Sequence, residues 1–342
     1  MIALPFSETN CLFISEAEDL ALQELLGDLS QKKISWKEAL QRIPDLGSAS
    51  RAMTKPMGRS LLHLAVLDNQ LDIIALFKKD PVLKVRRDVF GLSPMDLAQL
   101  LHRKEAMQHL ASLKDCFSME PGLPDGVELE YLPAPYFETQ EGLEQVLYAV
   151  AKVKAEDKIP EETIWLGVYF DREIQTGAHP PILIDQVHQN GGYGVFAEKK
   201  ISPCTFVGEY TGQILQHSKK PITHIRKKLE APKFPPPCEK GERRDKNYCL
   251  RYTVWDEKSS FSIDATTKGN FTRFINHSER PNVGLQPVYW RGVPRMIFIS
   301  LKEIEAGEQL GFGVAQRSIF ESCSVYTRST SMAPKRTAFK AF

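Results

Sequence analysis

Apolar side chains recur at helical spacing in the first part of the chain, which predicts two helices within residues 15–43. Ser15 and Glu18 have the spacing of a capping box, and Ser35 and Glu38 have it again. The apolar stripe of the first helix consists of Leu22, Leu25, Leu26 and Leu29. Pro44 and Gly47 are expected to end the second helix.

The next pattern is an internal repeat, because residues 58–65 return as residues 91–98 at an offset of 33. Ser60 and Ser93 stand where a helix N-cap belongs, and Pro94 suits the first helical position. The period, the glycine turn and the capped helix resemble the ankyrin repeat. Two such repeats bury little surface, so we expect the helices of 15–43 to complete the stack.

The two repeats differ at one position, where the first has His63 and the second has Asp96. We expect His63 to hydrogen-bond a turn, as a histidine at this position of an ankyrin-like repeat does. The residues leave two roles open for the array. It could present a partner-binding surface, or it could be a structural cap for the next domain.

A dense group of Pro and Gly in residues 120–138 predicts a linker or an irregular connection. Residues 139–155 then show the spacing of one amphipathic helix. The apolar run at 164–170 is expected to be a buried strand. Because composition changes at 120–138, we expect a chain that starts near Glu138 to fold and bind cofactor without the array.

From about residue 180 the chain alternates short apolar runs with Gly, Pro, Asn and Asp, which predicts a mostly-β domain. No alternation of strands and helices is visible, which argues against a Rossmann-type fold. Expected strands lie at 181–184, 206–210, 248–252, 261–264 and 296–300. The glycines at 191–194 are not followed by a helical pattern, so they are a weak dinucleotide signal.

Composition adds little to this picture, since a net charge of +1 gives no general attraction to nucleic acid or membranes. No signal peptide and no membrane span are apparent. Six cysteines without close pairs favour reduced thiols in an intracellular protein and no zinc site. These are Cys11, Cys116, Cys204, Cys238, Cys249 and Cys323.

Three polar stretches of the second half carry the chemistry, namely residues 192–196, 207–212 and 269–278. Together and in this order they resemble the SET domain of protein-lysine methyltransferases, over roughly residues 185–312. Arg273 to Ser278 reads Arg-Phe-Ile-Asn-His-Ser, which is the most specific of the matches. The resemblance implies an α+β protein, in which an all-α ankyrin-like array precedes a mostly-β SET domain.

The resemblance also implies site residues for the cofactor S-adenosyl-L-methionine and for a lysine substrate. Tyr248 is expected to line the lysine channel, and Phe312 matches the aromatic residue that tunes how many methyl groups are added. Asp264 is expected to cap a turn. The implied cofactor-binding residues are Gly192, Tyr193, Gly194, Tyr210, Arg273, Asn276 and His277. No metal is expected.

Two features depart from the family pattern. The zinc-binding cysteine clusters of many histone methyltransferases are missing, so the chain resembles the zinc-free branch. Val314 stands where a catalytic tyrosine is usual, and Phe312 and Gly313 precede it. The tail at 315–342 is basic and rich in Ser and Thr, and the insert at 216–247 is basic around three prolines. The insert could face an acidic partner or nucleic acid, or be a solvated loop.

These observations give four segments. They are a helical array at 1–119 with repeats at 58–119, a linker at 120–138, a SET-type domain at 139–314, and a tail expected to be disordered. The leading hypothesis is a protein-lysine N-methyltransferase that acts on a histone or another basic protein. The alternative is an inactive ankyrin-SET binding scaffold. The resemblance implies a nuclear site of action. If the chain is bacterial, it implies instead an effector that is secreted into a host cell.

Overall fold

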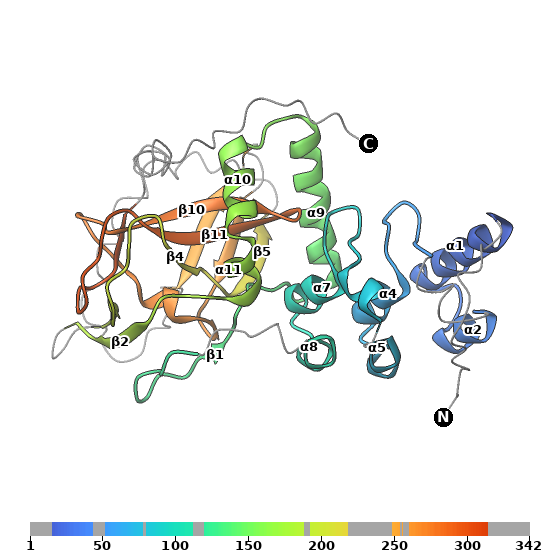
Figure 1. Cartoon of the computed structure of the whole chain (residues 1–342), viewed down its shortest axis with the longest axis horizontal. Helices are drawn as coiled ribbons and strands as arrows, with labels where there is room; N and C mark the ends of the chain where they lie inside the picture. Colours follow the sequence, from blue (N-terminus) through green and yellow to red (C-terminus); the bar gives the residue numbers. More distant parts are fainter. Residues whose placement is uncertain are drawn as a thin grey trace.

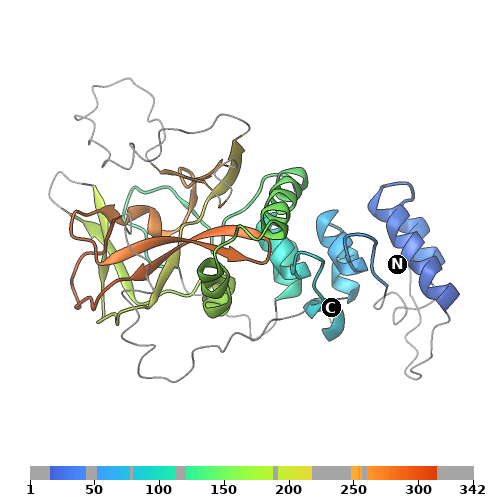
Figure 2. The same cartoon turned by 90° about the horizontal axis from the view of Figure 1, so that it is seen from above.

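The computed structural model describes residues 16–43, 52–77, 80–111, 120–187, 192–217, 248–253, 255 and 260–313. Helices occupy the N-terminal part and strands dominate the C-terminal part, so the fold is mixed α and β, as expected. Figures 1 and 2 show the helical array beside the sheets, with α9 (Gln140–Ala155) standing between them.

The array opens with α1 (Glu16–Ser30) and α2 (Trp36–Arg42). The capping box of Ser35 and Glu38 is present, which confirms that prediction. Ser15 lies outside the described residues. The apolar stripe of α1 is buried as expected, and it consists of Leu22, Leu25, Leu26 and Leu29.

The repeat of 33 residues is also a repeat of backbone conformation. Gly58 and Gly91 both have positive φ, at 63° and 90°. Asn69 and His102, again 33 residues apart, have φ of 53° and 52°. Each unit contains two helices, which are α4 (Leu61–Leu67) with α5 (Leu71–Phe77), and α7 (Pro94–Leu100) with α8 (Lys104–Leu110). The short α6 (Pro81–Val85) lies between the units.

His63 makes the turn contact that the sequence predicts. Its Nδ1 accepts from the Ser60 N–H at 3.2 Å, and its Nε2 donates to the Leu92 carbonyl of the next repeat at 3.0 Å. The side chain is fully buried, and desolvation lowers the pKa of His63 to about 4. The imidazole is therefore neutral at neutral pH.

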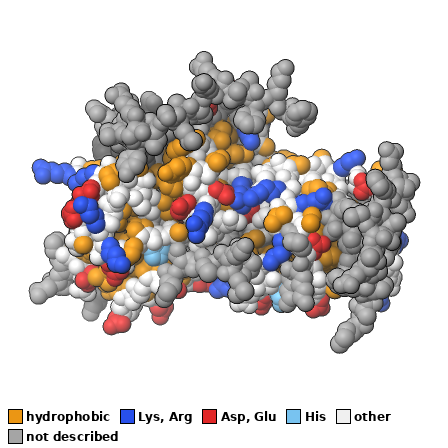
Figure 3. Space-filling model, in the orientation of Figure 1, with side chains coloured by type: hydrophobic (Ala, Val, Ile, Leu, Met, Phe, Trp, Pro, Cys, Tyr) orange, Lys and Arg blue, Asp and Glu red, His pale blue; other side chains and the backbone are white. Residues whose placement is uncertain are grey.

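The strand expected at 164–170 is wrong, because residues 164–169 belong to the helix α10 (Glu161–Tyr169) and Phe170 is its C-cap. A short apolar run cannot separate a strand from a packed helix, and the packing decides. A Cβ at Gly167 would collide with the Tyr289 carbonyl, so glycine lets the helix lie directly on β10 (Val283–Trp290). The outer face exposes Val168 and Tyr169, and Figure 3 shows hydrophobic side chains in this region.

The strands of the described residues form four sheets, and most of these strands follow α11 (Asp171–Thr176). The largest has the order β4-β11-β10-β12-β9. Its other strands are β4 (Phe206–Glu209), β9 (Asn276–His277), β11 (Val293–Ser300) and β12 (Gly311–Gly313). Strands β2 (Ile182–Gln186) and β3 (Tyr193–Ala197) pair with each other. The third sheet contains β5 (Gln213–His217), β7 (Ser260–Asp264) and β6 (Cys249–Thr253). All five expected strands are present, four of them to within two residues, and β11 begins three residues earlier than expected. The other strands, among them β10, were not expected.

The position of β12 matters most for the site. This strand runs parallel to both of its neighbours, β10 on one side and β9 on the other. The chain therefore returns after residue 310 and inserts between two segments that precede it in sequence. As a result, Phe312 is paired in register with His277.

The segment 120–138 does more than connect two parts. Its strand β1 (Glu130–Tyr131) pairs in parallel with β8 (Lys268–Gly269). Leu132, Ala134 and Phe137 are buried. This stretch is irregular, as its Pro and Gly content predicts, but it is part of the folded core.

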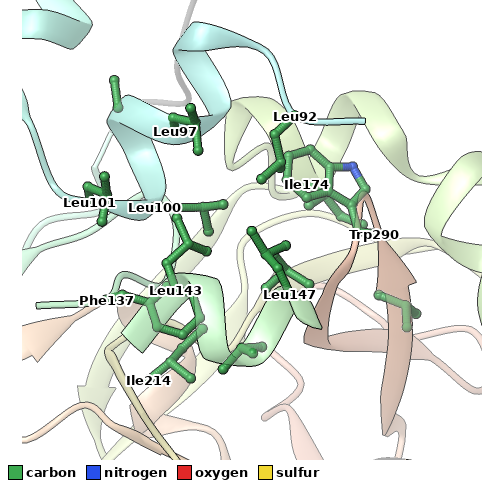
Figure 4. Close-up of a cluster of buried hydrophobic side chains, with 14 of the residues drawn as sticks. Leu92, Leu97, Leu100, Leu101, Phe137, Leu143, Leu147, Ile174, Ile214 and Trp290 are labelled. Carbon is green, nitrogen blue, oxygen red and sulfur yellow. The ribbon is translucent and has the colours of Figure 1, made fainter. Parts of the chain in front are cut away.

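The array and the sheets share one apolar core. Figure 4 shows Leu97 and Leu100 of the array facing Leu143 and Leu147 of α9, with Trp290 of β10 beside them. The Phe137 N–H donates to the Leu100 carbonyl at 2.7 Å. Removing the array would expose the apolar side chains of this shared core to water, so whether a chain without the array folds stays a prediction for a truncated chain to test.

A partly buried arginine adds ion pairs between the array and the sheets. Arg291 lies at the tip of the β10–β11 hairpin, and its Nη1 donates to both carboxylate oxygens of Asp96 at 2.6 Å. Its Nη2 donates to Asp171 at 2.7 and 2.9 Å. Asp96 thus replaces a repeat histidine and binds the other part of the molecule.

The structure also shows the oxidation state of two cysteines. Cys204 is disulfide-bonded, so the expectation of six reduced thiols is wrong at this position. Sequence spacing does not reveal which cysteines approach in space, and a disulfide needs that approach. Cys249 is a free cysteine. In the described part of the chain, no helix has the length and apolar character to cross a membrane, and no cluster of His, Cys, Asp or Glu could hold a metal ion.

Candidate functional site

The structure brings the first and third polar stretches together. The Asn276 amide donates through Nδ2 to the Tyr193 carbonyl at 2.9 Å. A Cβ on Gly194 would come within 2.6 Å of Gln309 Nε2 and 2.8 Å of Val187 Cγ2, so a larger residue here would require these side chains to move. Among the described residues, no heavy atom lies within 4 Å of a Cβ built on Gly192, so this part of the structure leaves space beside its backbone.

The second stretch is attached to the same place through hydrogen bonds. The Glu209 carbonyl accepts from Asn270 Nδ2 at 2.9 Å and from Thr272 Oγ1 at 3.2 Å. The Tyr210 hydroxyl donates to the Tyr248 carbonyl at 2.8 Å. Burial raises the pKa of Tyr210, so its hydroxyl stays protonated and remains a donor.

Aromatic rings form two groups around this meeting point. In one, the Phe274 ring lies 6.1 Å from Tyr193 and 6.4 Å from Tyr248. In the other, the Phe312 ring lies 5.9 Å from His277 and 5.7 Å from Phe298. Most of these pairs meet edge to face, the geometry that aromatic quadrupoles prefer.

Arg273 is bound to the protein rather than extended into solvent. Its Nη1 donates to the carbonyls of Ala265 and Thr266 at 2.8 and 2.9 Å. Its guanidinium carbon lies 3.6 Å from the centre of the Tyr248 ring. Its Nε is buried and has no hydrogen-bond partner within the described residues.

Behind the site lies a buried ion pair that sequence reasoning missed. The Glu209 carboxylate of β4 accepts two hydrogen bonds from Arg295 of β11, one from Nε and one from Nη2 at 2.7 Å. Both side chains are 1% exposed. Burial raises the pKa of the Glu209 carboxyl, while the charge of Arg295 opposes this effect. The pair fixes the strand that carries Tyr210.

All the site residues expected from the sequence fall within this region, namely Gly192, Tyr193, Gly194, Tyr210, Tyr248, Arg273, Asn276, His277 and Phe312. Val314 lies outside the described residues. Asp264 caps its turn as expected, by accepting from the Thr266 N–H at 2.9 Å. Phe274, Phe298 and Arg295 were not singled out beforehand. In the sequence they are ordinary members of apolar or strand patterns.

Comparison with known proteins finds a similar domain for this part of the chain. Residues 192–312 match the SET domain. The match covers the three polar stretches and ends at Phe312. It includes Tyr193, Asn276 and the first two residues of β12, and it leaves the helical array outside.

Curated relatives carry names that agree with this match. Histone-lysine N-methyltransferase Su(var)3-9 of Drosophila melanogaster is 30% identical over 42% of this chain and 21% of its own length. Human histone-lysine N-methyltransferase EHMT1 is 31% identical over 43% of this chain and 10% of its own. The chain therefore spans about a fifth or less of these two relatives.

The SUV39H2 histone-lysine N-methyltransferase of Xenopus tropicalis is 27% identical over 48% of this chain and 37% of its own length. A solved structure, a humanized mutant of the Chaetomium thermophilum Polycomb Repressive Complex 2 bound to the inhibitor GSK126, is 24% identical. It covers 43% of this chain and 17% of that chain at a TM-score of 0.30, so nothing below rests on it. Residues 192–312 of this chain are thus similar to the SET domain, and the relatives named here are histone-lysine N-methyltransferases.

The residues present fit the cofactor that such domains use. The open backbone at Gly192 allows a ligand to come close, and the nearby Arg273 Nε is a buried donor without a partner in the described residues. Asn276 carries a donor and an acceptor in one planar group, which suits an amino acid zwitterion. These features lie on neighbouring segments joined by the Asn276–Tyr193 hydrogen bond.

Proposed function

We propose that this protein is an S-adenosyl-L-methionine-dependent protein-lysine N-methyltransferase. The observation that carries the proposal is the convergence of residues 192–196, 209–210 and 273–277 on one aromatic region. Bound S-adenosyl-L-methionine would supply a methyl group on a sulfonium, which an uncharged amine takes while the sulfur keeps the bonding electron pair.

The cofactor would be held by the backbone at Gly192 and Gly194 and by the amide of Asn276. The side-chain hydrogen bond from Asn276 to Tyr193 fixes the amide plane before any ligand arrives. A preorganised polar group costs little to order on binding, which favours affinity. His277 would contribute its backbone, because its strand β9 is fixed in register with β12.

The lysine side chain would enter between the aromatic rings of Tyr248 and Phe312. Removing an ammonium group from water disfavours its charged form, so an aromatic channel lowers the pKa of the lysine amine. The tyrosine hydroxyl could then orient the lone pair of the amine. The proton that the amine loses would pass to water at the mouth of the channel.

The substrate is proposed to be a histone or another basic protein, since the curated relatives are named as histone-lysine methyltransferases. The array at 52–111 is proposed to be ankyrin-like, with the role of supporting the SET domain and of contacting a protein partner. A nuclear or chromatin site of action belongs to the same proposal. Direct nucleic-acid binding is not part of it.

The alternative of an inactive scaffold rests on Val314, which lies outside the described residues. The similar proteins are named as enzymes, so the comparisons give no support to the scaffold. A tyrosine at this place would supply a polar group, and losing one preorganised group of this kind costs about 10²–10³ in rate. Slow turnover is therefore the expected behaviour of the chain as it stands.

The test is incubation of the full chain with methyl-labelled cofactor and purified core histones, with Val314→Tyr beside it. Label on lysine, at a rate that increases in the variant, is the expected result. Mass spectrometry locates the modified lysine. If neither protein transfers label and neither binds the cofactor by calorimetry, the proposed function is wrong.

A further inference from the structure

The Arg273 side chain joins three segments of the site. It starts from η1 (Phe271–Phe274), and its Nη1 is bound by the two carbonyls that follow β7, those of Ala265 and Thr266. Its guanidinium then lies 3.6 Å from the centre of the Tyr248 ring, just before β6. Two hydrogen bonds to one nitrogen fix where the planar group lies, so the ring meets a rigid surface.

Tyr248 is held from several sides by the same set of contacts. Its carbonyl accepts from the Tyr210 hydroxyl at 2.8 Å and from the Ala265 N–H at 3.0 Å. Its ring packs between Arg273 and Phe274. The backbone and the ring of this residue are therefore both positioned by neighbours.

The hydroxyls of the neighbouring Tyr210 and Tyr252 donate hydrogen bonds to backbone carbonyls. Tyr210 donates to the Tyr248 carbonyl, and Tyr252 donates to the Pro294 carbonyl at 3.4 Å. In the described residues, no hydrogen bond joins the Tyr248 hydroxyl to another protein group. Among these three phenols, Tyr248 is the one whose oxygen is left for a substrate.

We propose that Arg273 is a positioning residue that fixes the phenol of Tyr248 for the substrate amine, rather than chiefly a ligand of the cofactor. This inference rests on the proposed function, in which Tyr248 faces the lysine. A guanidinium stacked on an aromatic face attracts it electrostatically and by dispersion. Lysine cannot reproduce the stack, because its ammonium is a compact point charge.

The competing role for Arg273 would act through Nε, its buried donor that has no partner in the described residues. A ligand role predicts loss of cofactor affinity when the side chain changes. A positioning role predicts loss of turnover at saturating cofactor with affinity retained. The two roles therefore differ in which measured quantity changes.

The test uses the full chain with Arg273→Lys and Arg273→Gln. Gln places an uncharged amide near the position of Arg273 Nε and lacks the reach of Nη1, so it removes the stack in a second way if the Lys variant fails to fold. Arg280→Lys is the matched control, because Arg280 is an exposed arginine that follows the same motif. Each protein is prepared with and without 3-fluorotyrosine at position 248, and the Val314→Tyr background serves for kinetics.

The expected result in the Arg273 variants is a shifted or broadened fluorine resonance, with Arg280→Lys unchanged. The turnover number is expected to fall about 10- to 100-fold, because small misplacements of a catalytic group have effects of this size. The dissociation constant of S-adenosylhomocysteine should change by less than about threefold, a small free-energy difference.

Two outcomes overturn the inference. One is an unchanged fluorine resonance in both Arg273 variants. The other is weakened cofactor binding with full turnover at saturating cofactor, which would make Arg273 a ligand. The fluorine measurement needs no activity, so it decides the positioning role even for an inert chain. A wild type that neither binds cofactor nor transfers methyl defeats the proposed function instead.

Discussion

His63 and Asp96 occupy the same place in successive repeats, and the structure gives them different partners. His63 binds the next turn within the array, through the Leu92 carbonyl. Asp96 keeps the local contact with Ser93 and also binds Arg291, 195 residues away. A single side chain therefore converts a repeat position into a contact between two parts of the molecule.

The buried His63 makes stability depend on pH. Its pKa is lowered to about 4 from an ordinary value of 6.5, so between these values the unfolded chain binds the proton and the folded chain does not. The free energy of unfolding should thus fall as pH falls from about 6.5 to about 4, by up to about 3 kcal/mol from this group.

Urea unfolding at pH 7.5 and pH 4.5 measures this effect. The control is His63→Gln, which can still hydrogen-bond but cannot titrate. Its loss of stability between the two pH values should be smaller than that of the wild type. Equal losses in the two proteins would contradict the assignment.

Asn276 offers a test of the proposed cofactor site. Asn276→Ala removes a donor and an acceptor next to the open backbone at Gly192. A lost hydrogen bond to a charged ligand costs about 1.5–3 kcal/mol, so affinity for S-adenosylhomocysteine should fall roughly 10- to 100-fold in calorimetry. Gln31→Ala, an exposed amide in the array, is the control. Unchanged affinity would remove Asn276 from the site.

At the scale of elements, α10 shows how packing chooses between helix and strand. Its apolar run suits either state, and the two differ in which side chains face the sheet. Gly167 permits close contact with the backbone of β10 at Tyr289. The helix is capped by Pro160 before it and has acidic Glu161 and Glu162 in its first turn, which favour a helix start.

The close contact at Gly167 predicts that replacing this glycine by alanine has the opposite effect on stability to the same change at Gly27. Gly167→Ala forces a Cβ into the Tyr289 carbonyl and should lower the free energy of unfolding by about 1–3 kcal/mol, the usual cost of overpacking. Gly27→Ala in α1 meets no atom within 4 Å and should raise it by about 0.5–1 kcal/mol. Denaturant unfolding of both variants checks the pair. Similar effects would mean that α10 does not rest on β10.

At the scale of the whole molecule, the array and the SET domain are expected to unfold together. They share an apolar core around Leu147 and Trp290, and charged contacts surround it. Arg59 of the array binds Glu144 of α9 at 2.7 Å, and the Gln99 amide donates to the Gln175 carbonyl at 3.1 Å. These extensive contacts favour an array that supports the other domain structurally over an array that recruits a partner from the end of a flexible tether.

Arg291→Gln tests how much the ion pairs of Arg291 contribute to the contact between the array and the sheets. It leaves the fully buried Asp96 carboxylate without its main counter-charge, and breaking a buried pair in this way costs about 3–5 kcal/mol. Arg172→Gln, an exposed neighbour, should change stability by less than about 0.5 kcal/mol. Thermal unfolding should show one transition that shifts as a whole. A chain starting at Glu138 should aggregate, and a soluble monomer with normal cofactor binding would contradict the shared core.

The sequence alone determined the local features, since these depend on residues close together in the chain. The capping box at Ser35, the 33-residue repeat, the helix at 139–155 and five of the strands follow from caps, periodicity and turn residues. The site residues could be named because the motifs around Gly192 and Asn276 are short and specific. Their recognition required a known family, not geometry.

The tertiary structure decided what depends on contacts between distant residues. Residue spacing could not predict contacts between segments that lie far apart in the chain. These contacts are the packing that makes α10 a helix, the stacking of Arg273 on Tyr248, the Glu209–Arg295 pair and the ion pairs of Arg291. Periodicity reports which side of an element is apolar, but not which surface covers it. For this chain, that covering surface joins the array to the SET domain in one core.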